Sequence, residues 1–135
     1  MKETSELFNK IKAYDGNDIG FIEGKEFKCP KIEFYLAGLF HERNIKVKEI
    51  IRRLNLERTY GYQIFNGTRH PSRDILIRLA LLLGLNLEET QRLLKIGGKN
   101  ILYPRVRKDA IAVFAIEKGY SPEEYEMLLQ EVEES

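Results

Sequence analysis

The sequence has very few residues that bind metals or form disulfides. Its 135 residues include one cysteine, Cys29, two histidines, His41 and His70, and no tryptophan. A lone thiol builds no disulfide framework and fits a reducing compartment. Without a spaced cluster of acids, these residues predict no metal site and no cofactor. Paired carboxylates, a nucleophile–base pair and a Gly-rich phosphate loop are also lacking, so we assign no catalytic residue and do not expect an enzyme.

Long apolar runs are lacking as well. The longest, residues 75–87, is interrupted by Arg78, Gly84 and Asn86. It falls short of the roughly 20 residues that a membrane span needs. The first ten residues are polar and mixed in charge, unlike the apolar region of a signal peptide. These absences predict a cytoplasmic protein that does not enter a membrane.

Charge is nearly balanced overall but unevenly distributed. The formal net charge is +1, yet residues 43–78 hold nine bases and three acids, which gives that segment +6. Residues 121–135 hold six acids and no base. This asymmetry is compatible with a local nucleic-acid footprint, and equally with a solvated helix face.

Residues that start and stop helices occur at short, regular intervals from residue 31 onward. Asn44, Gly67, Gly84 and Gly119 are typical helix ends. Ser72, Asn86 with Glu89, and Ser121 with Glu124 are typical helix starts. We therefore predict an all-α fold with helices at about 32–43, 47–54, 58–66, 73–83, 86–96 and 105–118, and a last one from 122. Residues 1–30 predict a short helix and a loop.

The most informative stretch is residues 46–66, KVKEIIRRLNLERTYGYQIFN, followed by GTRHPS. It predicts two short helices joined by a turn at 55–57. This pattern resembles the Cro-like (phage-repressor-type, XRE) helix-turn-helix family over about residues 32–96. The Asn-Gly-x-Arg-x-Pro-Ser run from Asn66 to Ser72 is its most specific part. The resemblance implies a five-helix repressor-like bundle. It divides the chain into an N-terminal appendage (1–30), a DNA-binding domain (31–98) and a C-terminal two-helix extension (99–135).

The apolar residues of this stretch fit two helices that cross at a steep angle. We expect Ile50, Ile51 and Leu54 to form the buried face of the first helix. Leu56 should be buried in the turn, and Ile64 should hold the second helix against the core. The family usually has a small residue at the position of Ile51 and a branched apolar residue at the position of Gly61. Here the sizes are exchanged, and we predict that Ile51 fills the space left by Gly61.

The resemblance implies DNA-contacting residues, with 58–66 as the recognition helix in the major groove. The positions that read bases fall on Arg58, Thr59, Tyr62 and Gln63. The positions that touch the DNA backbone fall on Lys46, Lys48, Asn66, Thr68, Arg69 and Arg73. These imply a sequence-specific transcriptional regulator that binds double-stranded DNA.

The last two predicted helices carry more apolar residues than a simple tail needs. They either complete the core of the bundle or form an interface, and a homodimer through these helices suits a two-fold DNA site. The alternative function is an adaptor or antitoxin-like protein that uses the helix-turn-helix fold to bind a protein partner without reading bases.

Overall fold

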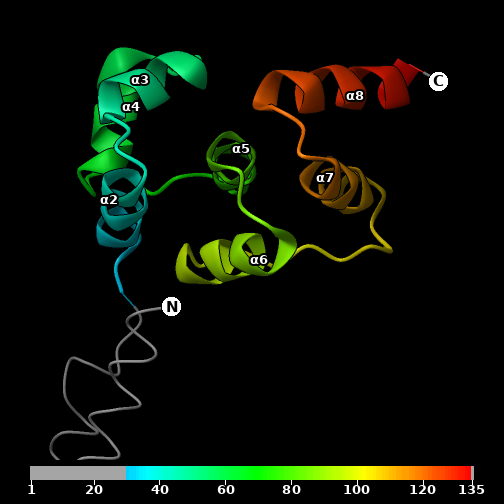
Figure 1. Cartoon of the computed structure of the whole chain (residues 1–135), viewed down its shortest axis with the longest axis horizontal. Coiled ribbons are helices and arrows are strands. Elements are labelled where there is room, and N and C mark those ends of the chain that lie inside the picture. The colour runs from blue at the N-terminus through cyan, green and yellow to red at the C-terminus, as the bar shows by residue number, and fades with distance from the viewer. Residues whose placement is uncertain (1–29, 135) are drawn as a thin grey trace, which may run out of the picture. The chain divides into compact units, whose positions relative to one another are not determined.

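The computed structural model describes residues 30–134, and Lys31–Ser135 form one compact unit (Figure 1). The appendage expected in residues 1–30, with Cys29, lies outside the described residues apart from Pro30. The described part holds seven helices and no strand, which confirms the all-α prediction. These are α2 (Ile32–Glu42), α3 (Val47–Arg53), α4 (Arg58–Phe65), α5 (Arg73–Leu83), α6 (Leu87–Ile96), α7 (Arg107–Lys118) and α8 (Pro122–Glu134).

Local chemistry at the helix ends accounts for most of these bounds. Asn86 and Glu89 form a reciprocal capping box at the start of α6, with N–H···O distances of 2.8 and 3.0 Å. Ser121 and Glu124 do the same before α8, at 3.1 and 2.9 Å. Asn44 ends α2 with a φ of 54°, a left-handed conformation that asparagine tolerates. These predicted starts and stops are confirmed.

The start predicted for α7 was two residues early. The helix begins at Arg107 rather than Arg105. The Val106 backbone N–H donates to the Tyr103 carbonyl at 2.9 Å, so Pro104 and Arg105 lie in a turn. Val106 then serves as the N-cap without a side-chain hydrogen bond.

Helix α5 lies at the centre of the packed unit. Seven of its eleven residues are buried, which is far more than one stripe of a surface helix. It packs against α6, α7 and α8, while α4 packs against α2 and α3 (Figure 1). Leu76 and Leu79 of α5 are fully buried.

The two C-terminal helices share this core. Ala112 and Ala115 of α7 and Tyr125 of α8 belong to the same buried cluster as α5. Burial also raises the pKa of Tyr125 to about 12. Phe114 and Met127 on the same two helices are 45% and 62% exposed. No helix within residues 30–134 has the length and apolar character to cross a membrane.

Candidate nucleic-acid interface

Helices α3 and α4 are joined by a four-residue turn and pack on each other. Ile50 and Leu54 near the end of α3 and Ile64 in α4 are at most 2% exposed. Asn55 makes the turn possible with a φ of 56°. Leu56 is half-buried and packs against the core, so the predicted apolar contacts are confirmed.

The prediction that Ile51 fills the space beside Gly61 is also confirmed. A Cβ built on Gly61 would lie 2.7 Å from Cγ1, 2.9 Å from Cδ1 and 3.1 Å from Cγ2 of Ile51. Ile51 is 6% exposed and occupies the space that a side chain at Gly61 would need. The contact between α3 and α4 is therefore filled by the Ile51 side chain of α3.

Glu57 fixes the start of α4. Its carboxylate accepts hydrogen bonds from the backbone N–H groups of Tyr60 (2.8 Å) and Thr59 (3.0 Å). These bonds, that of Tyr60 first, hold the pKa of Glu57 below its ordinary value. Glu57 is one of the three acids of residues 43–78, and its capping role was not predicted from the sequence. Its position immediately before Arg58 was the signal available, although glutamate is not among the preferred N-cap residues.

Three of the four predicted base-reading residues are exposed on α4. Arg58, Thr59 and Tyr62 reach solvent, and Tyr62 is 40% exposed. Tyr62 follows Thr59 by three residues and Arg58 by four, so its side chain neighbours both on the helix surface. The fourth, Gln63, is half-buried.

Gln63 is held by a residue that we predicted to contact the DNA backbone. Arg69 Nε donates to Gln63 Oε1 at 2.9 Å, and the Arg69 backbone N–H donates to the Gln63 carbonyl at 3.0 Å. The Arg69 guanidinium also lies over the Tyr60 ring, 5.7 Å from its centroid. Arg69 therefore orients the Gln63 amide by binding its oxygen.

The remaining backbone candidates flank α3 and α4. Lys46 is the N-cap of α3, and Lys48 lies in its first turn. Asn66 ends α4, and its Oδ1 accepts from the Thr68 backbone N–H at 2.9 Å. All four side chains are exposed.

Arg73 differs from the other candidates because its guanidinium forms an ion pair with a buried carboxylate of the same chain. It makes two parallel bonds to the Asp109 carboxylate, both of 2.9 Å. It also donates to the carbonyls of Asn100 (2.9 Å) and Ile101 (3.0 Å). Asp109 is 5% exposed, and its pKa is lowered, first by the Arg73 hydrogen bond. The Arg73 side chain therefore ties α5 to α7 and to the chain before it, and its contact with the DNA backbone stays a prediction.

Two further arginines of the basic segment pair with acids of α8. Arg53 lies 3.6 Å from Glu123, and Arg78 binds Glu126. The acidic end of the chain thus contacts the basic segment of the same chain at its first turns. These pairs, like that of Arg73, lower the charge that residues 43–78 present to a partner.

The described residues define an all-α protein with an exposed polar helix face beside a basic loop. Comparison of the chain with protein-family models, with curated proteins and with solved structures found no match. Its function is therefore argued from its own residues.

Proposed function

We propose that this chain is a sequence-specific transcriptional regulator that binds double-stranded DNA through a Cro-like helix-turn-helix. Helices α3 and α4 are its two members, and α4 is the recognition helix. Helices α2 to α6 form the five-helix bundle, and α7 and α8 form the extension. The observation that carries the proposal is the exposed face of α4, where Arg58, Thr59 and Tyr62 lie on a helix anchored by Ile64.

The anchoring matters because base readout needs a rigid helix. Ile64 has no exposed surface, and Ile51 packs directly on the Gly61 backbone. Arg58 suits bidentate recognition of guanine, and Thr59 offers a hydroxyl and a methyl group. Gln63 would donate its NH₂ to adenine N7 while Arg69 holds its oxygen.

The test is to titrate genomic DNA fragments, starting with the promoter of the gene itself, at several salt concentrations. Arg58→Ala is expected to cost about 1–3 kcal/mol on the preferred fragment and to relax its selection. Lys46→Ala with Lys48→Ala is the matched comparison, and it should weaken all fragments alike. A wild-type protein that prefers no fragment at low salt would contradict the proposal.

A second feature bears on partners. Two adjoining hollows of about 290 and 280 Å³ lie between α7 and α8. Their apolar lining comes mainly from Ile111, Phe114, Leu128 and Val132. One recognition helix reads few bases, so a homodimer on a two-fold site is expected. We propose as its interface the groove of the second hollow, which Phe114 and Leu128 line and Lys108 does not. The same groove favours the second candidate, an adaptor or antitoxin-like protein with another protein as partner.

Phe114→Asp distinguishes the two candidates. For the regulator, light scattering is expected to show a wild-type dimer and a monomeric variant with unchanged circular dichroism, because a buried unpaired charge opposes the interface. For the adaptor, the wild type is monomeric alone, selects no DNA, and forms a stoichiometric complex that Phe114→Asp breaks and Arg58→Ala leaves intact. A dimer that survives Phe114→Asp places the interface elsewhere.

A further inference from the structure

We propose that residues 99–108 form a second DNA-phosphate-binding element that extends the contact beyond the helix-turn-helix. This inference rests on the proposed function and adds a surface that the helix-turn-helix resemblance does not include. We call these residues, which join α6 to the start of α7, the 99–108 segment.

The charge of the segment is the first argument. It holds four bases and no acid, with the sequence KNILYPRVRK. Lys99 is half-buried, and Arg105, Arg107 and Lys108 are exposed. Arg107 donates to the Val132 carbonyl at 3.3 Å. Among the described residues, no ion pair involves Lys99, Arg105 or Lys108.

Two of these bases do not stabilise the helix in which they lie. Arg107 and Lys108 are the first two residues of α7. The N-terminus of a helix carries a partial positive charge, and bases there are unfavourable. Only Asp109 in that turn has the favourable sign, and it is already bonded to Arg73. An anion from outside the chain would offset the repulsion between these two bases and the positive end of the α7 dipole.

Hydrogen bonds hold residues 100–103 of the segment in one shape. Arg73 binds the carbonyls of Asn100 and Ile101. The Gln91 side chain makes two bonds to the Leu102 backbone, of 2.9 and 2.7 Å. The Tyr103 backbone N–H donates to Asp109 at 2.9 Å. A surface fixed before binding loses little conformational entropy when it binds.

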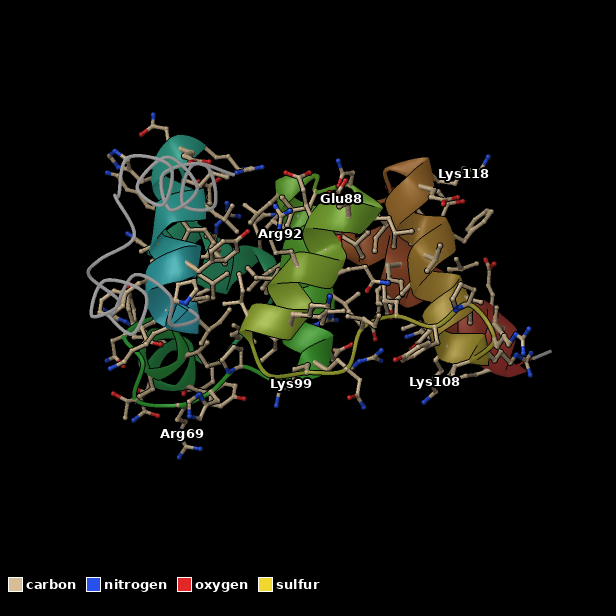
Figure 2. The ribbon with its side chains drawn as sticks, turned by 90° about the horizontal axis from the view of Figure 1, so that it is seen from below. Arg69, Glu88, Arg92, Lys99, Lys108 and Lys118 are labelled. Carbon is tan, nitrogen blue, oxygen red and sulfur yellow. The ribbon has the colours of Figure 1, made fainter. Side chains whose placement is uncertain are left out.

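The position of the segment is the fourth argument. Figure 2 shows Arg69, Lys99 and Lys108 along one edge of the structure, and Glu88, Arg92 and Lys118 along the opposite edge. Arg69 lies in the loop between α4 and α5, three residues after the C-cap of α4. A DNA strand carries a phosphate about every 3.4 Å, so cations spread along one edge suit its backbone.

The test compares two charge-matched variants on the preferred fragment. Lys99→Gln with Lys108→Gln removes two cations from the proposed edge, and Arg92→Gln with Lys118→Gln removes two from the opposite edge. Each cation that meets a phosphate contributes about 0.9 to the slope of log K against log salt concentration. The first variant is expected to reduce this slope by about 1.8 and keep the fragment preference. The second is expected to leave the slope unchanged.

Thermal unfolding is the accompanying readout, and the first variant should unfold no earlier than the wild type, because Lys108 opposes the α7 dipole. If the two variants show equal slopes of log K against log salt concentration, the inference is overturned. The proposed function still stands in that case, provided that the wild type binds its preferred fragment. A wild type that binds no duplex overturns the proposed function, and the segment with it. Binding of poly-glutamate in place of duplex, lost only in the first variant, would assign the segment to an acidic protein instead.

Discussion

Replacement of Arg73 by alanine is expected to lower the free energy of unfolding by about 2–3 kcal/mol at neutral pH. The variant leaves the Asp109 carboxylate, 5% exposed, without its cation. Loss of one partner from a buried pair costs about 3–5 kcal/mol, and the Arg73 side chain, at 32% exposure, brings the expected cost below that range. Urea unfolding measures the difference.

The pH dependence identifies the cause. In the wild type the pKa of Asp109 is held below its ordinary value of 3.8, so its stabilising contribution is present above about pH 4 and lost as the pH falls through the folded pKa. Without Arg73, burial favours the protonated form of Asp109. Lowering the pH protonates this carboxyl in the variant and so removes the cost of a buried, unpaired charge. The stability difference between the two proteins should therefore narrow from about pH 7 to about pH 3.5. A difference that stays constant over that range would refute a role for the Arg73–Asp109 charge pair.

An exposed ion pair supplies the control for Arg73. Arg92 lies 3.8 Å from Glu88, whose side chain is 84% exposed. Arg92→Ala is expected to change stability by less than about 0.5 kcal/mol, because water screens such pairs. A loss of stability as large as that of Arg73→Ala would mean that burial of the Arg73–Asp109 pair does not increase its contribution to stability.

The second large effect concerns the contact between α3 and α4. Ile51→Ala is expected to cost about 3 kcal/mol, the usual loss for a buried isoleucine. Gly61→Ala gains about 1 kcal/mol of helix propensity and loses about 1–3 kcal/mol to overpacking. A net loss is expected because Ile51 meets the new Cβ with three of its carbons. Ile51 is β-branched and therefore stiff at χ1, which makes it costly for the side chain to turn away from the new Cβ.

The sign of the Gly61 substitution should then depend on residue 51. In an Ile51→Ala background the new Cβ enters free space, so Gly61→Ala should stabilise the protein by about 1 kcal/mol. Gly38→Ala is the matched control, because a Cβ on that helical glycine meets nothing within 4 Å. It should stabilise both backgrounds. Additive effects of the changes at 51 and 61 would contradict the packing described here.

The sequence predicted the helices well where each boundary depends on neighbouring residues. Ser72, Asn86 and Ser121 cap helices through atoms within three residues, so their role is visible in a short window. The start of α7 was predicted two residues early because the N-cap, Val106, makes no side-chain hydrogen bond that a sequence pattern could reveal. Arg105 lies in the turn before the helix. The size exchange of Ile51 and Gly61 was predictable only because the helix-turn-helix pattern aligned two positions ten residues apart.

Side-chain partners distant in sequence could not be predicted. Arg73 and Asp109 are 36 residues apart, and nothing near either residue marks the other. Arg73 was placed among the DNA contacts by the family resemblance, because it lies at the start of a helix. The bond between Arg69 and Gln63 joins two residues that the pattern had assigned separate roles. Such pairings depend on how the helices pack, and a one-dimensional pattern does not contain that information.

The pairing of the basic segment with α8 gives the field of this protein a direction. Arg53 and Arg78 are matched by Glu123 and Glu126, so each pair acts on distant ions mainly as a weak dipole. Arg69, Lys99 and Lys108 lie instead along one edge (Figure 2). These cations attract a polyanion to that edge, although the net charge is only +1. The orientation of the protein when it meets a polyanion, rather than its total charge, therefore decides which collisions lead to contact.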